Sequence, residues 1–201
     1  MGNPYIREGL LFPADELNYY NGVLPDGAPD RIFAACDVAW GGGDSLSMPI
    51  AYVYGDSVYI HDVVFNNGDK EVTRPAVVGR ILQHKIQMVR LEANNGGDEY
   101  CDKVSEILRA KGCKANMSHR KAPTTQSKVS RIIQYAPEIK RFYFLDDRHR
   151  TQEYRKFMNE LTTFVQIGKN PHDDAPDSLA MLVAFAQSMI GNRAEIVKRM
   201  F

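Results

Sequence analysis

Residues 31–65 contain three short apolar stretches separated by glycine-containing turns. One begins at Arg31 and ends at the glycine turn 41–45, a second covers 47–54, and a third covers 57–65 after the Gly55-Asp56 hairpin signal. Connections this short join neighbouring antiparallel strands. The pattern therefore predicts three consecutive antiparallel strands at the start of the domain.

Beyond residue 69, apolar positions recur at helical spacing and alternate with further short apolar runs. Pro75 and Pro137 place the start of one helix near Arg74 and the end of another near Tyr135. The predicted helices are 74–85, 98–111, 127–135 (or from 125), 151–161 and 174–190, and the predicted strands are 87–92, 113–117, 141–146 and 162–169. Helices between strands predict an α/β domain with a mixed sheet.

The first 30 residues differ from the rest in their turn-forming composition. They contain four prolines and three glycines after position 3, with one possible helical turn within residues 14–20. We interpret 1–30 as a linker or arm from an upstream domain, 31–191 as the single folded domain, and 192–201 as a basic tail. A chain of 201 residues with 44% hydrophobic residues suits one sizeable core.

Charge and cysteine content exclude several classes of protein. The net charge is zero, so no overall field attracts a polyanion, yet the segment between Glu106 and Glu138 holds seven lysines and arginines and no acidic residue. This basic block is either a solvated face or a local DNA contact. Three cysteines without a CxxC pair argue against a disulfide framework or a zinc knuckle. The sequence shows neither an apolar run of about 20 residues for a membrane span nor a signal-peptide core.

Carboxylates stand at three places that are otherwise apolar or turn-like. Asp37 interrupts a buried strand, Glu92 ends the short strand 87–92, and an acidic cluster at 172–178 opens the last apolar helix. A charge at the edge of a core is costly unless a cation faces it. If the three places converge, their oxygens make a site suited to Mg²⁺ or Mn²⁺.

Three motifs in this order resemble the ribonuclease H-like fold, and more narrowly the C-terminal nuclease domain of the large terminase subunit of tailed bacteriophages. They are Asp37-Val-Ala-Trp-Gly-Gly-Gly-Asp44, Leu91-Glu-Ala-Asn-Asn-Gly-Gly97 and His172-Asp-Asp-Ala-Pro-Asp-Ser-Leu-Ala180. Segment 7–17 also resembles the connector that follows the ATPase domain in that family. The resemblance covers nearly the whole chain and implies a mixed sheet of five or more strands, three antiparallel and then parallel, flanked by helices.

The resemblance also implies roles for individual residues. A metal-dependent endonuclease of this family cleaves double-stranded DNA during viral genome packaging by two-metal phosphodiester hydrolysis. Asp37 would bridge two ions and Glu92 would hold one of them. Asp174 and Asp177, one helical turn apart, would face the other ion, while Asp173 either caps the helix or binds metal. Independently of the resemblance, the charge of the basic block makes Arg120, Lys121 and Lys128 candidates to contact DNA phosphates. Two residues are secondary candidates: Asp44 either satisfies the glycine turn or assists the site, and His172 either orients water or phosphate or is an exposed or capping residue.

The implied partners are double-stranded DNA, the portal protein, the small terminase subunit and the ATPase domain of the same large subunit. The glycine run 41–45 lacks the lysine of a G-x-x-x-x-G-K-[ST] loop, so we expect no ATP site in this chain. We expect a monomeric nuclease domain that acts in the host cytoplasm and not at a membrane. A junction resolvase or another ribonuclease H-like nuclease, and a non-catalytic docking module of a packaging motor, remain alternatives.

Overall fold

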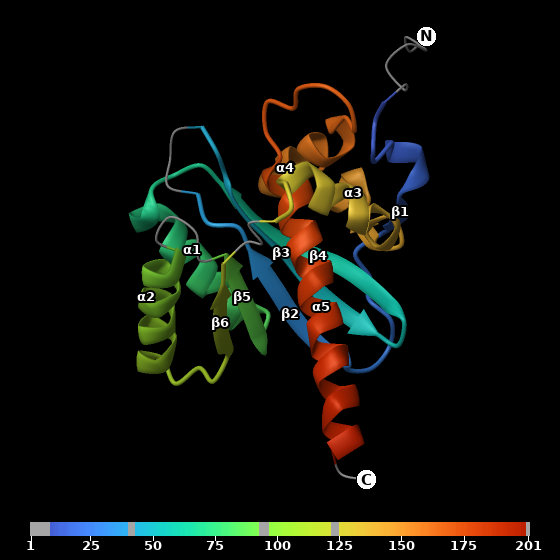
Figure 1. Ribbon diagram of the computed structural model, residues 1–201. Helices are drawn as coiled ribbons and strands as arrows, with labels where there is room; N and C mark the ends of the chain where they lie inside the picture. Colours follow the sequence, from blue (N-terminus) through green and yellow to red (C-terminus); the bar gives the residue numbers. More distant parts are fainter. Residues whose placement is uncertain (1–8, 40–42, 93–96, 122–124, 200–201) are drawn as a thin grey trace.

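The computed structural model describes residues 9–39, 43–92, 97–121 and 125–199, with side chains described up to Ile190. One seven-stranded sheet has the order β1-β7-β4-β3-β2-β5-β6 (Figure 1). The strands are β1 (Asn18–Tyr20), β2 (Arg31–Cys36), β3 (Leu46–Tyr54), β4 (Ser57–Asn66), β5 (Met88–Glu92), β6 (Asn116–Arg120) and β7 (Tyr143–Leu145). The mixed α/β fold predicted from the sequence is confirmed.

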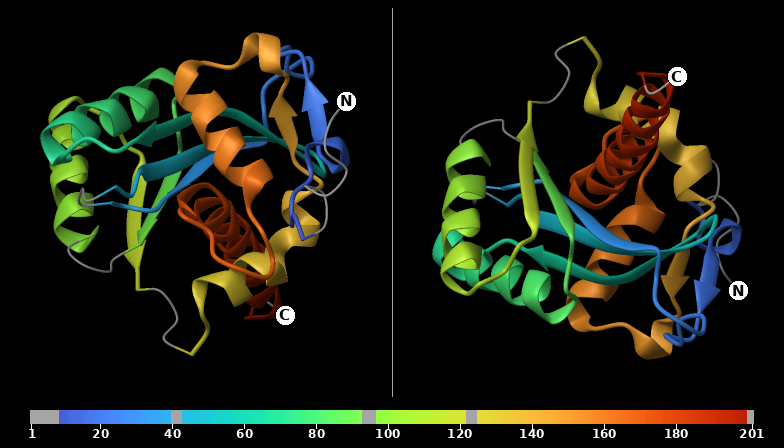
Figure 2. Two further views of the ribbon diagram at one scale, coloured as in Figure 1. Left: turned by 90° about the horizontal axis from the view of Figure 1, so that it is seen from above. Right: turned by 90° about the horizontal axis from the view of Figure 1, so that it is seen from below.

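Five α-helices cover the two faces of this sheet. α1 (Lys70–Gln83) and α2 (Gly97–Ala110) lie on one face, and α3 (Lys128–Ile139), α4 (Gln152–Thr163) and α5 (Asp174–Arg199) lie on the other (Figure 2). Two single-turn helices, Ala14–Glu16 and Asp147–His149, complete the described elements. No helix in the described ranges has an apolar stretch of the length that a bilayer requires.

Strand pairing explains how the sheet becomes mixed. β2 pairs antiparallel with β3, which pairs antiparallel with β4, as the hairpin signals predict. On its other side β2 pairs parallel with β5, with Cys36 opposite Leu91. Parallel neighbours end at the same edge of a sheet, so the residues that follow Cys36 and Leu91 emerge side by side.

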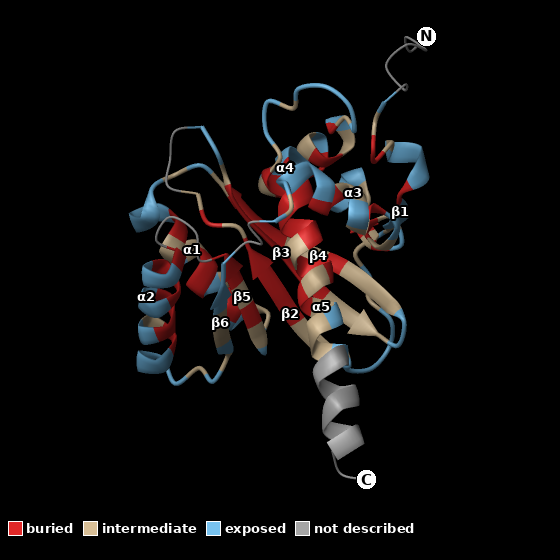
Figure 3. Ribbon diagram, in the orientation of Figure 1, coloured by how far each residue is buried: buried red, intermediate tan, exposed pale blue. Residues whose placement is uncertain are grey.

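The sheet separates two hydrophobic cores. The larger packs strand residues such as Phe33 and Phe144 against Phe157, Leu179 and Val183 of α4 and α5. The smaller packs the opposite face of β2, β3 and β5 against α1 and α2. Buried residues fill the central strands and the first half of α5 (Figure 3). Because both faces are covered, the central strands are continuously apolar.

Two predicted helix boundaries are wrong because proline is tolerated where we expected it to break the helix. α1 begins at Lys70, four residues before the predicted start, because the Asp69 carboxylate caps it by accepting hydrogen bonds from the N–H groups of Glu71 and Val72. α3 continues through Pro137 to Ile139, where the packing of Ala136 and Ile139 in the larger core supports its last turn.

Three further predictions differ from the structure. The strand predicted at 113–117 lies at 116–120, three residues later along the chain. Residues 162–169 form no strand, and only an isolated bridge joins Val165 to Leu10. α5 continues beyond Ile190 to Arg199.

Part of the predicted arm packs on the domain. β1 pairs parallel with β7 at the edge of the sheet, and Leu11, Phe12 and Leu17 belong to the larger core. The prolines and glycines of this segment resemble a linker. Its apolar residues lie in short irregular stretches, so they show no helix or strand period. An upstream ATPase domain stays a prediction.

Candidate metal centre

Two of the predicted carboxylates lie at the ends of neighbouring parallel strands. Asp37 directly follows β2 and Glu92 is the last residue of β5. An isolated bridge fixes the backbone of Asp37, whose N–H donates to the Ser47 carbonyl at 2.9 Å and whose carbonyl accepts from the Ser47 N–H at 3.0 Å. The carboxyl ends of β2 and β5 therefore place both residues at the same end of the sheet.

The first turn of α5 brings further carboxylates to the same edge. Asp174 and Asp177 are three residues apart and both are buried, which places them on one face of the helix. Asp173 precedes the helix, and its carbonyl accepts the first helical bond, from the Asp177 N–H at 2.9 Å. Asp173 thus stands at the N-cap position, one of the two roles that the sequence left open.

Neighbouring elements fix the start of α5. The Asp174 carboxylate accepts a 2.7 Å hydrogen bond from the Ser45 N–H, and the hydroxyls of Ser47 and Ser178 are 2.8 Å apart. Glu160 of α4 accepts a 2.9 Å bond from the Ala175 N–H, one of the amide groups that a helix start leaves without a partner. α4 therefore supplies the cap of α5.

Arg131 of α3 joins the strand end to the helix. Its guanidinium donates to Asp177 Oδ1 from Nε at 3.0 Å and from Nη2 at 2.6 Å, and Nη2 also reaches Glu92 Oε2 at 3.2 Å. The Arg131 and Glu92 side chains are each 9% exposed and that of Asp177 is fully buried. Buried carboxylates are costly unless a cation pairs with them, and the Arg131 guanidinium is that cation for Asp177 and Glu92.

Lys128, one turn before Arg131, places its ammonium among three carboxylates. Lys128 Nζ lies 3.4 Å from Asp37 Oδ2, 3.3 Å from Asp173 Oδ1 and 3.2 Å from Asp177 Oδ2. The sequence suggested that Lys128 contacts DNA. In the structure its charge is directed at the acidic cluster, and its contact with DNA stays a prediction.

Burial and mutual repulsion set the charge of the cluster. Burial raises the pKa of Asp37 to about 7; the Lys128 ammonium opposes this rise, and Asp177 and Glu92 add to it. Burial also raises the pKa of Asp174, against the lowering effect of the Ser45 hydrogen bond. Burial alone would lower the pKa of Lys128, but the carboxylates of Asp37 and Asp177 outweigh it and raise that pKa above its ordinary value. Lys128 is therefore fully charged.

One oxygen of this cluster is left without a hydrogen bond in the described part of the chain. Asp177 Oδ2 is buried, and although Lys128 Nζ is 3.2 Å away, the pair lacks hydrogen-bond geometry. A buried carboxylate oxygen without such a partner is costly and is suited to a metal ion. The possible metal ligands around Asp177 Oδ2 are carboxylate oxygens, the ligands that Mg²⁺ and Mn²⁺ prefer. The residues present therefore fit the implied ions.

A second group of possible ligands adjoins this cluster. Asp44, His172 and Asp174 place one ligand atom each within 4.8 Å of one another. His172 Nδ1 and Asp44 Oδ1 are 3.9 Å apart, and both side chains are exposed. Both residues thus lie beside Asp174, and their assisting role stays a prediction. The glycine motif between Asp37 and Asp44 includes residues 40–42, which lie outside the described residues.

Arg120 and Lys121, the other two predicted DNA contacts, lie at the end of β6, the edge strand of the sheet. Arg120 ends β6 in register with Glu92, and Lys121 follows it; both are exposed. Sequence reasoning missed Arg131 and Glu160 as members of the site. Arg131 belongs to the basic block and stands three residues after Lys128, a spacing that places both on one helical face. Nothing in the local sequence marks Glu160.

Comparison with protein families finds a matching family model, a terminase domain. The family model described as "Terminase Bacteriophage T7, Ribonuclease H-like domain" matches residues 36–141, just over half of the chain. This match begins one residue before Asp37 and includes Glu92, Lys128 and Arg131. No curated protein sequence matches the chain.

Solved structures of viral terminases share the fold at low sequence identity. The nuclease domain of the human cytomegalovirus terminase has a TM-score of 0.59 at 9% identity, covering 87% of this chain and 94% of that one. The nuclease domain of the large terminase subunit gp2 of bacterial virus Sf6 has a TM-score of 0.55 at 10% identity, covering 77% and 88%. The large terminase of a thermophilic bacteriophage, solved with ADP, has a TM-score of 0.55 at 13% identity. The match covers 88% of this chain and 45% of the thermophilic phage protein, so the chain spans less than half of that terminase.

Proposed function

Because the chain belongs to the terminase family of bacteriophage T7 ribonuclease H-like domains, we propose that it is a metal-dependent endonuclease that cleaves double-stranded DNA during viral genome packaging. Its fold is that of viral terminase nuclease domains. A variant of the Sf6 domain has been solved with manganese and beta-thujaplicinol, and the cytomegalovirus domain with manganese and an inhibitor. These ligands belong to the relatives, and they support the choice of ion proposed for this chain.

One observation carries the proposal: carboxylates from two strand ends and one helix meet around a buried oxygen that lacks a hydrogen bond. Asp37, Glu92 and Asp177 are linked through the shared cations Lys128 and Arg131. Asp177 Oδ2 has an ion pair with Lys128 but no hydrogen bond within the described residues, so its lone pairs are available to a metal ion. An electrostatically costly arrangement of this kind is typical of a functional site.

Each residue of the cluster has a proposed task. Asp37, Asp174 and Asp177 would hold the ions, Glu92 would complete the ligand set, and Asp173 at the N-cap is a further candidate ligand. Bound Mg²⁺ or Mn²⁺, proposed as two ions, would supply Lewis-acid activation of water and of the scissile phosphate. Arg131 orients two of the ligands by holding Asp177 Oδ1 and Glu92 Oε2.

The substrate and the wider assembly follow from the same proposal. Arg120 and Lys121, exposed beside Glu92 at the end of β6, would contact the DNA backbone through charge and without sequence preference. The portal protein, the small terminase subunit and an ATPase domain of the same large subunit are the proposed partners. The proposed place of action is the host cytoplasm.

Plasmid cleavage tests the proposal. Supercoiled DNA is incubated with the chain in Mn²⁺, Mg²⁺ or EDTA, and the Asp37→Asn variant is compared with Asp56→Asn, a matched change at the exposed β3–β4 turn. We expect nicking and linearisation that require metal, disappear in Asp37→Asn and persist in Asp56→Asn. Absence of cleavage in both metals would favour the docking module, and preferred cutting of a four-way junction would favour the resolvase.

A further inference from the structure

The Lys128 ammonium lies in the position of a cation within the acidic cluster. Its three contacts, to oxygens of Asp37, Asp173 and Asp177, are 3.2 to 3.4 Å long and differ by only 0.2 Å. Charge-assisted hydrogen bonds are usually about 2.7 to 2.9 Å long. Lys128 Nζ is therefore centred among several oxygens and does not bind tightly to any one of them.

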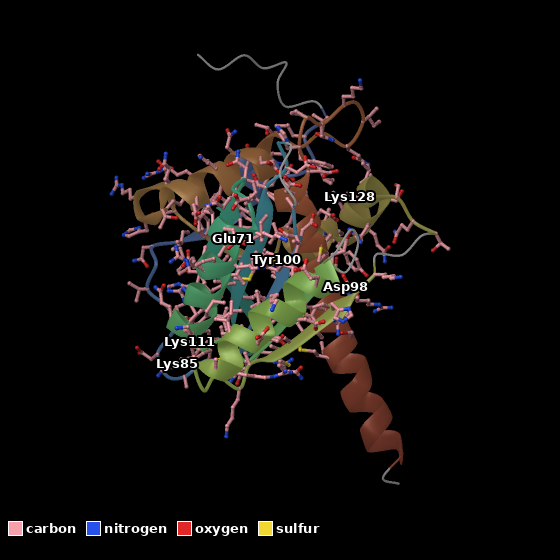
Figure 4. All side chains as sticks on the ribbon, turned by 90° about the vertical axis from the view of Figure 1, so that its left-hand side faces the viewer. Glu71, Lys85, Asp98, Tyr100, Lys111 and Lys128 are labelled. Carbon is pink, nitrogen blue, oxygen red and sulfur yellow. The ribbon has the colours of Figure 1, made fainter. Side chains whose placement is uncertain are left out.

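Lys128 also differs from Arg131 in how firmly it is held. The Lys128 side chain is 42% exposed, and it begins α3, where a flexible four-carbon stem can turn toward solvent without moving the helix. Figure 4 shows Lys128 at the same end of the domain as Asp98, the end opposite Lys85 and Lys111. Arg131 is 9% exposed and fixed by two carboxylates. Of these two cations, only Lys128 is placed to leave the cluster.

A divalent ion and this ammonium compete for the same oxygens. Asp177 Oδ2, the buried oxygen without a hydrogen bond, is also the Asp177 oxygen nearest Lys128 Nζ. A metal bound there would require the lone pairs that now face the ammonium, and two cations at such short range repel each other. The two therefore exclude each other at this position.

We propose that Lys128 is an internal counter-ion that occupies the acidic cluster before metal binds and is displaced by the metal. This inference rests on the proposed function and adds regulation of the same site. Lys128 holds the mutually repelling carboxylates together in the metal-free domain and thereby lowers the affinity for the ion. The released ammonium remains at the mouth of the site, where it is free to meet a DNA phosphate.

Metal affinity measured without DNA tests this inference. Mn²⁺ binding by calorimetry is compared between the wild type, Lys128→Gln, Lys128→Arg and a matched control, Lys111→Gln, an exposed lysine at the opposite end of the domain, together with the melting temperature of each metal-free protein. We expect Lys128→Gln to lower the metal-free melting temperature and to bind Mn²⁺ at least tenfold more tightly. Lys128→Arg and Lys111→Gln should remain within about twofold of the wild type.

The outcomes separate this inference from the proposed function. If the wild type binds Mn²⁺ and Lys128→Gln binds it equally or more weakly, the counter-ion role is overturned and the nuclease proposal is not. If neither binds Mn²⁺ more tightly than Asp37→Asn does, the metal site itself is overturned.

A second measurement needs no folded glutamine variant. The NMR signal of the Lys128 ammonium, assigned by its loss in Lys128→Arg, should move to the position of solvent-exposed lysines when Mg²⁺ is added. A signal that stays unchanged at saturating Mg²⁺ would also overturn the displacement.

Discussion

Arg131 holds Asp177 by one oxygen and leaves the other oxygen open. Nε and Nη2 of Arg131 both donate to Asp177 Oδ1, at 3.0 and 2.6 Å, and Asp177 Oδ2 is buried without a hydrogen bond. The arginine thus neutralises a fully buried carboxylate and fixes its rotation. It also leaves the other oxygen beside Lys128 Nζ, where the ion is proposed to bind.

Arg131→Met should destabilise the metal-free domain by about 3 kcal/mol, the usual cost of leaving a buried charge without its partner. Urea unfolding of the wild type, Arg131→Met and Arg109→Met would measure this loss. Arg109 is exposed on α2, so its variant should differ from the wild type by less than about 0.5 kcal/mol. Equal stability of all three proteins would show that Arg131 is not needed to neutralise Asp177.

The metal-free domain should lose stability as the pH rises from about 4 to about 7. The pKa of Asp37 is raised from 3.8 to about 7 in the folded protein, so in this window the unfolded chain releases a proton that the native state retains. Asp37→Asn carries no charge and should match the wild type near pH 4. At pH 8 it should be more stable by up to about 4 kcal/mol, since each pKa unit corresponds to about 1.4 kcal/mol.

Urea unfolding of both proteins from pH 4 to pH 8, in EDTA, measures this difference directly. Titrating groups distant from the cluster act on both proteins alike, so the difference between the two curves reports Asp37 together with the carboxylates coupled to it. A constant difference across this range would contradict the raised pKa.

Glu160→Ala should destabilise the start of α5. The Ala175 N–H would lose its acceptor, which costs about 1 kcal/mol at a helix cap and lowers the melting temperature by about 2 to 4 °C in a domain of this size. Glu160→Gln keeps an oxygen for the same N–H. Because burial already raises the pKa of Glu160, the neutral amide should be nearly as stable as the wild type.

Thermal unfolding and plasmid cleavage would be followed together for these variants. We expect Glu160→Ala to lose cleavage activity at temperatures where it is still folded, because Asp174 and Asp177 lie in the turn that it loosens. Glu106→Ala, on the exposed face of α2, serves as the control. Equal effects of the alanine and glutamine variants would contradict capping.

Lys121→Ala should weaken DNA binding equally across sequences. Each phosphate contact contributes about 0.9 to the magnitude of the slope of log affinity against log salt concentration, so losing one contact should reduce that magnitude by about 0.9. Fluorescence anisotropy with two unrelated duplexes at several salt concentrations measures it. Lys111→Ala, at the opposite end of the domain from Lys128 (Figure 4), should leave the slope unchanged. An unchanged slope in Lys121→Ala would exclude this residue from the interface.

The order of elements could be predicted from the sequence because strand and helix periods are local properties. Three antiparallel strands, the helices and the final apolar helix were all found, and the acidic motifs marked Asp37, Glu92 and the start of α5. The errors arose where distant contacts override local signals. Tertiary packing carries α3 through Pro137, and pairing with β7 makes a strand of residues 18–20 that look like linker.

The sequence by itself determined which carboxylates stand at strand and helix ends, since an acidic residue within an apolar run is visible without coordinates. Only the tertiary structure decided which cations face them and which oxygen stays open. Lys128 and Arg131 lie 36 or more residues from Glu92 and from Asp173 and Asp177 along the chain, and Glu160 caps a helix that begins 14 residues later. Ion pairs and caps of this kind depend on how helices pack across the sheet, and no local pattern records that packing.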